Sequence, residues 1–226
     1  MATIYAHTND GYVVRTNQSS WSNARATTTG TGYSDSTNSG AFGVSAYRAS
    51  ARGGGYAFNI YRSFFFFDTS GISADVDSAT FKVRGFSQAG GDLIAVKSNS
   101  DIETLGTADF GSIVGWNTTT DGEGGGDNEG NVIKYSDEIP AWSTSSYNNI
   151  TLSPQALADM RDDDTVYICL LNYDYDLLDI APTGYTSHRN GLYYTNYTGT
   201  SRDPYIDYDL AAVASTDNAI FFGTNF

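Results

Sequence analysis

Four consecutive phenylalanines, Phe64 to Phe67, constrain the fold of this chain more than any other segment. Side chains of a β-strand alternate between its two faces, so a strand through this run places two aromatic rings on each face. Both faces must then be covered, as for a central strand of a sandwich. Burial of a helix is the competing interpretation, but the run is short and ends in Asp68-Thr69-Ser70-Gly71, which favours a turn. A central strand is therefore predicted over Tyr61 to Asp68.

The segments that follow also favour strands over helices. Apolar and polar side chains alternate from Ser78 to Phe86, which is typical of a half-buried strand. Further strands are expected at Leu93 to Lys97, Thr165 to Asn172 and Pro204 to Tyr208. One helix of two turns is predicted from Pro154, because Ser153 can cap it and proline suits the first helical position.

Polar, glycine-rich segments predict loops between these strands. Thr27 to Gly40 reads as a loop or as short edge strands, and residues 106–131 read as one long loop. Long loops in compact domains are usually functional or mobile. The pair Asn190-Gly191 predicts a turn, which places His188 in a polar turn as well.

Composition supports an all-β protein. The 226 residues suffice for one sizeable domain, aromatic residues make up 14%, and charged residues only 17% against roughly 25% in an average soluble domain. Glycines, tyrosines and phenylalanines are abundant, as expected for turns and strands. We predict an antiparallel β-sandwich, of the jelly-roll type, with one short helix over residues 1–212, followed by an apolar C-terminal segment at residues 213–226.

The net charge of the chain limits the classes of partner that it is expected to bind. The formal net charge is −14, which argues against nucleic acid and disfavours anionic membrane surfaces. It is compatible with cations or with neutral partners such as sugars. No stretch approaches the ~20 apolar residues of a membrane span, and no secretory signal opens the chain. Cys169 is the one cysteine, so no intramolecular disulfide is expected, and a packed, inert thiol is predicted.

An acidic loop is the candidate metal site. Four carboxylates alternate with glycines in the long loop: Asp121, Glu123, Asp127 and Glu129. Calcium prefers six to eight oxygen ligands, and glycine lets the backbone turn carbonyl groups inward. The spacing is not that of an EF-hand, and a solvated acidic loop is the alternative. Possible Ca²⁺ is the only cofactor expected.

No catalytic residue is predicted. Nucleophilic catalysis needs a base beside the nucleophile, but the histidines are His7 and His188 only, and no G-x-S-x-G motif occurs. Paired carboxylates could hydrolyse glycosides, and one aspartate cluster offers such pairs: Asp174, Asp176 and Asp179.

Aromatic side chains are the candidate ligand contacts. A flat ring with an apolar face and a polar rim suits a sugar, which makes Trp116, Tyr193 and Tyr194 candidate glycan-binding residues. Trp116 is favoured because it adjoins the long loop. Most aromatic residues are instead expected in the core or in an interface.

The last residues of the chain are too apolar for a free tail. Ile220, Phe221, Phe222 and Phe226 either pack on their own domain or dock on another subunit. They are the predicted assembly interface.

The order of segments resembles that of DNRLRE-type jelly-roll modules, although the charged string that names the family is not present. Those modules combine R-x-hydrophobic-F-D-x-S-x-I, S-A-x-hydrophobic, L-x-x-x-A-L, a hydrophobic strand and P-x-hydrophobic-x-Y. The counterparts here are Arg62 to Ile72, Ser78 to Val83, Leu152 to Leu157, Val166 to Leu171 and Pro204 to Tyr208. The resemblance covers roughly residues 5–210. It implies a carbohydrate-module-like sandwich used on surfaces, as in bacteriophage head-decoration, fibre and tail proteins, and it implies no catalytic residues.

The preferred hypothesis is therefore a non-enzymatic virion structural protein, made in the host cytoplasm and released by lysis. It would be displayed on the capsid or tail and held by other virion proteins and by further copies of itself. The alternatives are a carbohydrate-binding module for host or cell-surface glycan and a glycoside hydrolase.

Overall fold

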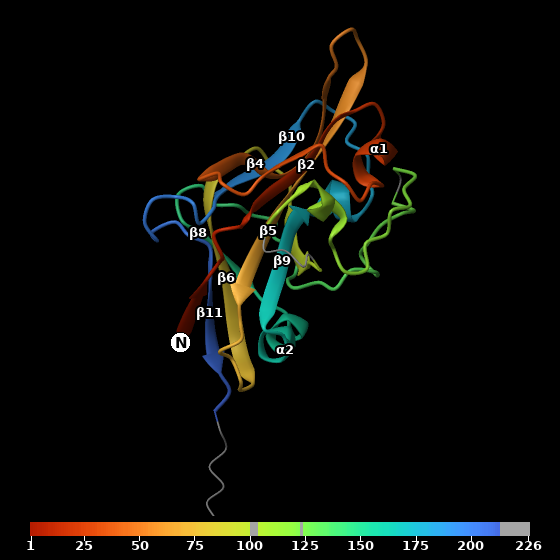
Figure 1. Cartoon of the computed structure of the whole chain (residues 1–226). Helices are drawn as coiled ribbons and strands as arrows, with labels where there is room; N and C mark the ends of the chain where they lie inside the picture. The colour runs from red at the N-terminus through yellow and green to blue at the C-terminus, as the bar shows by residue number, and fades with distance from the viewer. Residues whose placement is uncertain (100–103, 123, 213–226) are drawn as a thin grey trace, which may run out of the picture.

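The computed structural model describes residues 1–99, 104–122 and 124–212, and confirms the predicted all-β fold (Figure 1). The strands are β1 (Ala2–Tyr5), β2 (Gly11–Gln18), β3 (Gly32–Ser34), β4 (Ser39–Ser50), β5 (Tyr56–Asp68), β6 (Val76–Gln88), β7 (Leu93–Lys97), β8 (Tyr147–Thr151), β9 (Thr165–Asn172), β10 (Ser187–Tyr193) and β11 (Tyr205–Leu210). The helices are α1 (Trp21–Arg25) and α2 (Pro154–Asp162), with a 3₁₀ turn at Thr107–Gly111 and a π turn at Tyr173–Leu177. The predicted segment 213–226 lies outside the described residues.

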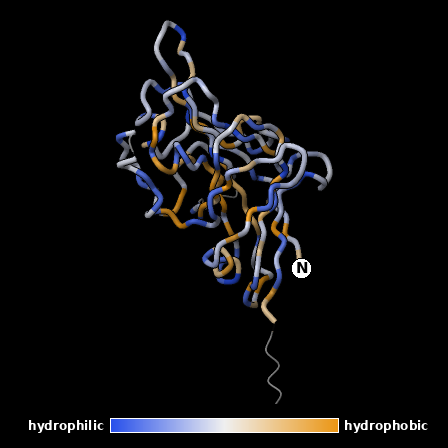
Figure 2. Tube along the Cα trace, turned by 180° about the vertical axis from the view of Figure 1, so that it is seen from behind, coloured by the Kyte–Doolittle hydropathy of each residue, from blue (hydrophilic) through white to orange (hydrophobic). Residues whose placement is uncertain are grey.

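Two antiparallel layers form the sandwich. Strands β1, β11, β6 and β8 pair in that order to form sheet A. Strands β3, β2, β5, β9 and β7 pair in that order to form sheet B. Strands β10 and β4 connect the two layers, because β10 pairs with the C-terminal part of β6 and β4 pairs with β5. Seen from behind, the apolar stretches gather in the central strands and the hydrophilic ones in the peripheral loops (Figure 2).

Strand β5 explains why four phenylalanines can follow one another. Phe65 and Phe67 face sheet A, where their ring centroids lie 5.1 and 5.5 Å from that of Phe81. Phe64 and Phe66 face the opposite side and belong to a second apolar cluster with residues of α1 and of the long loop. Burial of each such ring contributes about 1.5–3 kcal/mol. Both faces are covered as predicted, but the second cover consists of loops and a short helix instead of a sheet.

Several local predictions are confirmed. Strands β7 and β9 have the expected bounds, and β6 buries Ala79, Phe81 and Val83 on one face. Helix α2 begins with a proline, and the Ser153 hydroxyl accepts a hydrogen bond from the Ala156 N–H at 3.4 Å. The long loop contains one 3₁₀ turn and otherwise no helix or strand in its described part.

The predicted turn at Asn190-Gly191 is wrong, because strand β10 runs through it and carries a bulge there. A Cβ atom on Gly191 would lie 2.3 Å from the Ser87 Oγ and 2.8 Å from the Gly40 carbonyl oxygen. Glycine is needed here for the close approach of three strands. The predicted polar turn around His188 is wrong for the same reason, since His188 lies in β10.

Candidate functional site

The outer face of sheet A carries aromatic and cationic side chains. Since Phe81 and Val83 of β6 point into the core, the alternation of the strand directs Lys82, Arg84 and Phe86 outward. The pairing registers place Tyr205 opposite Lys82 and Tyr147 opposite Arg84. The strands of sheet A thus bring together residues that are far apart in the sequence.

One group of rings lies across β1, β11 and β8. The ring centroid of Tyr205 lies 5.6 Å from that of Tyr5 and 5.1 Å from that of Tyr147. The Lys82 Nζ lies 5.4 Å from the Tyr205 ring and 2.8 Å from a carboxylate oxygen of Asp207. Partial burial raises the pKa of Tyr147 to about 12, so its phenol is neutral at physiological pH.

A second group of rings lies where β6 meets β10. The Tyr193 centroid lies 5.3 Å from that of Phe86 and 5.2 Å from that of Tyr197. The Arg202 guanidinium lies over both tyrosines, 4.5 Å from the Tyr193 ring centre and 4.3 Å from that of Tyr197. These are cation–π contacts, which hold the rings in a fixed arrangement.

We call the two groups together the aromatic face. Its members are Tyr5, Lys82, Arg84, Phe86, Tyr147, Tyr193, Tyr197, Arg202 and Tyr205. Tyr5 is 50% and Phe86 42% exposed, and the others are half-buried. Tyrosine and arginine are enriched in the buried centres of protein interfaces, and flat aromatic rings also stack on sugars. The face has the chemistry of a contact surface.

The predicted glycan-binding residues are not brought together. Tyr193 lies on the aromatic face, but Tyr194 is fully buried, with its hydroxyl 2.7 Å from the Ser63 Oγ and its ring packed on Phe65. No face of the Tyr194 ring is left for a glycan. Trp116 is half-buried on the other side of the molecule, where the guanidinium groups of Arg62 and Arg25 lie 4.1 and 4.9 Å from its ring.

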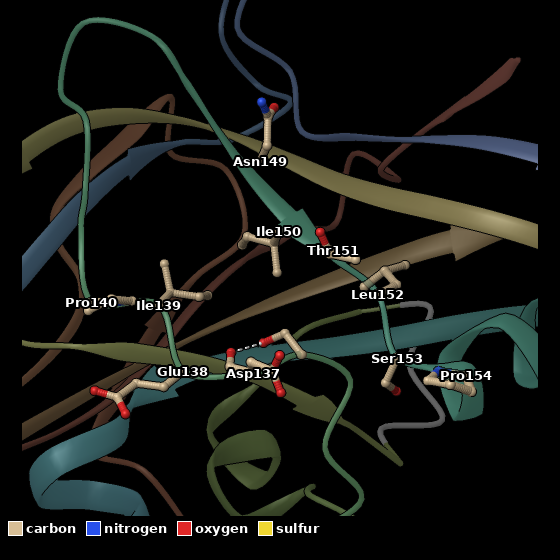
Figure 3. Close-up of a pocket in the computed structure, with 11 residues that line it drawn as sticks. Asp137, Glu138, Ile139, Pro140, Asn149, Ile150, Thr151, Leu152, Ser153 and Pro154 are labelled. Carbon is tan, nitrogen blue, oxygen red and sulfur yellow. Dashed lines mark hydrogen bonds between the residues drawn. The ribbon is translucent and has the colours of Figure 1, made fainter.

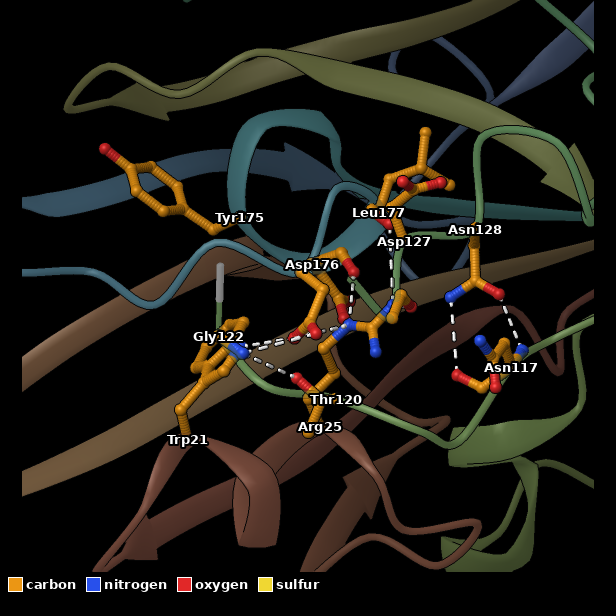
Figure 4. A network of polar contacts seen from close by, with 12 residues as sticks. Trp21, Arg25, Asn117, Thr120, Gly122, Asp127, Asn128, Tyr175, Asp176 and Leu177 are labelled. Carbon is orange, nitrogen blue, oxygen red and sulfur yellow. Dashed lines mark hydrogen bonds and ion pairs between the residues drawn. The ribbon is translucent and has the colours of Figure 1, made fainter. Parts of the chain in front are cut away.

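Beneath the long loop lies a buried polar network that sequence reasoning did not find (Figure 4). Arg62 binds Asp176 with two hydrogen bonds of 2.7 Å, and both side chains are fully buried. Arg25 donates to the carbonyl oxygens of Thr119 and Gly126, at 3.0 and 2.8 Å. Arg62 also donates to the Phe110 carbonyl oxygen, so Arg62 ties the loop to strand β5 and Arg25 ties it to helix α1, which gives Trp116 and its arginines a structural role.

Asp179 belongs to the same network. Its carboxylate accepts hydrogen bonds from the Trp21 Nε1 at 2.8 Å and the Asp121 N–H at 3.0 Å, and it lies 3.6 Å from the Arg25 Nε. Arg25 and Arg62 thus neutralise Asp179 and Asp176. This pairing removes both aspartates from the set that could supply an acid–base pair for glycoside hydrolysis.

The predicted calcium loop does not bring together Asp121, Asp127 and Glu129, the three of its four carboxylates that the structure describes. The Asp121 carboxylate accepts a hydrogen bond from the Gly125 N–H at 3.1 Å, and the Asp127 carboxylate accepts one from the Glu129 N–H at the same distance. The Glu129 Oε1 forms an ion pair with the Lys134 Nζ, at 3.2 Å. Among the described residues these carboxylates form no group that could hold a metal ion, because each is turned toward its own neighbours; Glu123 lies outside that part of the chain.

A different group of carboxylates does converge. Oxygen atoms of Asp92, Glu138 and Asp174 all lie within 4.8 Å of one another. A hydrogen bond with Asp92 raises the pKa of Glu138, and burial raises that of Asp174. Protonation of this group competes with cation binding. Sequence spacing gave no signal for it, because the three residues come from three separate segments.

The remaining reactive side chains have ordinary environments. The His188 ring packs against the Tyr175 ring with a centroid distance of 4.3 Å and an interplanar angle of 39°, and burial lowers the pKa of His188. The His7 Nδ1 accepts the N–H of Asn9 at 3.2 Å. Cys169 is fully buried in β9, and burial raises the pKa of its thiol well above the usual range, as expected for a packed cysteine.

Comparisons of the chain with protein-family models and with curated proteins find no match. Within the described residues, no helix has the length and apolar character needed to cross a bilayer.

Proposed function

We propose that this chain is a non-enzymatic structural protein of a bacteriophage particle, displayed on the capsid or tail, and that the aromatic face is its contact with neighbouring subunits. The aromatic face is the observation that carries the proposal. The resemblance to surface-displayed jelly-roll modules supports its location on a virion, and the all-β sandwich fits such a role.

The aromatic face combines six rings with three cations on one side of sheet A. A smaller group of exposed rings lies on β5 and the loop before β10, where the Arg48 guanidinium lies over Tyr56 and near Tyr185. Covering exposed apolar area contributes roughly 25 cal/mol per Å². Tyrosine and arginine contribute most where a partner excludes water from them. Subunit contact through this face therefore stabilises an assembly.

Removing rings from the aromatic face should weaken self-association of the chain. The double variant Tyr193→Ala/Tyr205→Ala removes one ring from each group, and we expect association at least about tenfold weaker, because each lost ring contact contributes on the order of 1 kcal/mol. Sedimentation velocity measures this on the full chain. Tyr33→Ala is the matched control, since Tyr33 is 49% exposed on strand β3 of the other sheet. Equal weakening by the control, or no weakening by the double variant, contradicts the proposal.

A carbohydrate-binding module is the second candidate, and the group around Tyr193 favours it. The rings of Phe86, Tyr193 and Tyr197 lie edge to face, with interplanar angles of 80° and 76°, so they offer a sugar one ring face with ring edges beside it, and Arg202 adds donors for sugar hydroxyls. A glycan array distinguishes the two functions. Specific binding by a monomer, lost in Tyr193→Ala, supports the module; oligomers without sugar binding support the structural protein.

The predicted assembly residues Ile220, Phe221, Phe222 and Phe226 lie outside the described residues, and their role stays part of the proposal. Possible Ca²⁺ also stays a prediction, to be tested by comparing the melting temperature with Ca²⁺ and with a chelator.

A further inference from the structure

A groove runs beside strand β8, at the open side of the sandwich (Figure 3). It encloses 440 Å³ between β8 and the segment 136–140. Ile139 and Ile150 point into it from opposite walls, and Asp137 and Glu138 lie at its floor in this view. The groove thus offers apolar walls to a narrow, extended ligand.

The backbone of β8 faces this groove with unused hydrogen-bonding groups. The Leu152 N–H donates to the Ala79 carbonyl of β6 at 3.0 Å, whereas the Ser153 N–H donates in the opposite direction, to Tyr135, at 2.8 Å. Because backbone groups of a strand alternate in direction, the N–H and C=O groups of Asn149 and Thr151 also point away from β6. No hydrogen bond between residues that the structure describes reaches them on that side.

The groove is also the seam between the two sheets. At the other side of the sandwich, β10 and β4 connect β6 to β5. Here, β8 ends sheet A, and sheet B ends at the segment 133–139, which is bridged to β7 through the pairs Leu93–Ile139 and Val96–Lys134. One added strand beside β8 would close the sandwich.

We propose that residues 220–222 of a second copy of this chain occupy the groove as an added strand on β8. Ile220-Phe221-Phe222 has the residue types that favour strands and carries no charge. In an extended conformation Ile220 and Phe222 share one side, which suits the apolar walls at Ile139 and Ile150. Backbone hydrogen bonds to Asn149 and Thr151 provide the affinity of the added strand, and its side-chain contacts determine the register in which it pairs with β8. The inference rests on the proposed assembly function.

The geometry favours a second copy over the same chain. Strand β11 leads out of sheet A at the end where Leu210 pairs with Val76, two strands away from β8. Strand spacing and rise put Ala212 about 20 Å from Thr151 in a straight line, and the eight residues to Ile220 reach about 26 Å when fully extended. The Ala211 N–H is bonded to the Asp75 carbonyl, so the direct path meets the turn between β5 and β6. The difference of about 6 Å leaves little length for a detour around this turn.

Disulfide trapping tests the proposal on the full chain. The variant Thr151→Cys/Phe221→Cys, whose two positions share the side of the sheet opposite to Ile150, should form disulfide-linked dimers and larger species on oxidation, whereas Thr3→Cys/Phe221→Cys, on the exposed edge strand β1, should not. The buried thiol of Cys169 does not interfere. A cross-link within one chain, or equal trapping at Thr3, overturns the proposal.

Backbone substitution provides a second test, read by sedimentation velocity. Thr151→Pro removes the N–H that faces the groove and leaves the bonds to β6 in place, so association should weaken about tenfold. Thr151→Val keeps this N–H and should associate like the original chain. If Thr151→Pro associates normally while Tyr193→Ala/Tyr205→Ala does not, strand addition is wrong and the aromatic contact stands. If the unmodified chain stays a monomer at all concentrations, both are wrong.

Discussion

At the scale of single residues, Asp10 is a buried carboxyl whose protonation is coupled to folding. Its side chain is fully buried, and the Thr195 hydroxyl donates to it at 2.6 Å. Burial is the largest effect and raises the pKa of Asp10 to about 7, although the hydrogen bonds from Thr195 oppose this shift. The folded state therefore binds a proton that the unfolded chain, with a pKa of 3.8, has already lost.

This coupling predicts the pH dependence of stability. Between pH ~4 and ~7 only the folded state holds the proton, so the free energy of unfolding falls as the pH rises, by on the order of 4 kcal/mol across the window. Asp10→Asn cannot titrate and should make the slope shallower, which urea unfolding at several pH values measures. Asp77→Asn, at an exposed position of β6, is the matched control for the loss of one carboxyl group. An unchanged slope in Asp10→Asn would show that other groups cause the dependence.

At the scale of elements, strand β10 depends on Gly191, which the local sequence pattern assigns to a turn. Gly191→Ala places a methyl group against Ser87 and the Gly40 backbone, so it should lower the free energy of unfolding by about 1–3 kcal/mol. Chemical denaturation measures the loss. Gly71→Ala is the control, because a Cβ there meets nothing within 4 Å and its backbone φ is not in the left-handed region. Equal stability of the two variants would mean that β10 relaxes around the added methyl group.

The strands that could be predicted are those in which the pattern of apolar residues within the strand itself indicates which side chains are buried. The phenylalanines of β5 and the alternation of β6 are local signals, and both led to the observed strands. Strand β4 gave no such signal, because its glycines and small residues make room for larger partners: a Cβ on Gly43 would lie 3.0 Å from Leu192 and 3.1 Å from the Tyr194 hydroxyl. Its burial is a property of the pairing with β10, which lies far along the chain.

The candidate site was accessible to sequence reasoning only in part. Tyr193 was singled out as an aromatic residue, but the same argument selected Tyr194, which follows β10 directly and is fully buried. Tyr5, Tyr147 and Tyr205 come together only through the registers of three strand pairs. Sequence composition predicts that aromatic surfaces exist, whereas strand register decides which rings share one.

At the scale of the whole molecule, the net charge opposes the assembly that the aromatic face and β8 favour. Each copy carries a formal charge of −14, so copies repel one another at low ionic strength. The aromatic face collects three cations, Lys82, Arg84 and Arg202, and Lys82 is paired with Asp207. Because six rings outnumber these cations, we expect contacts through this face to depend mainly on the rings, which salt screens little.

Added salt should accordingly strengthen self-association. Raising NaCl from about 20 to about 300 mM shortens the Debye length from roughly 20 to 6 Å, which screens the repulsion between copies. Sedimentation velocity should show larger species at the higher salt concentration, and sodium sulfate should act more strongly because it also favours apolar burial. The Tyr193→Ala/Tyr205→Ala variant should gain less from salt than the original chain. Dissociation by salt would instead mean that ion pairs between copies, and not contacts between rings, hold the assembly.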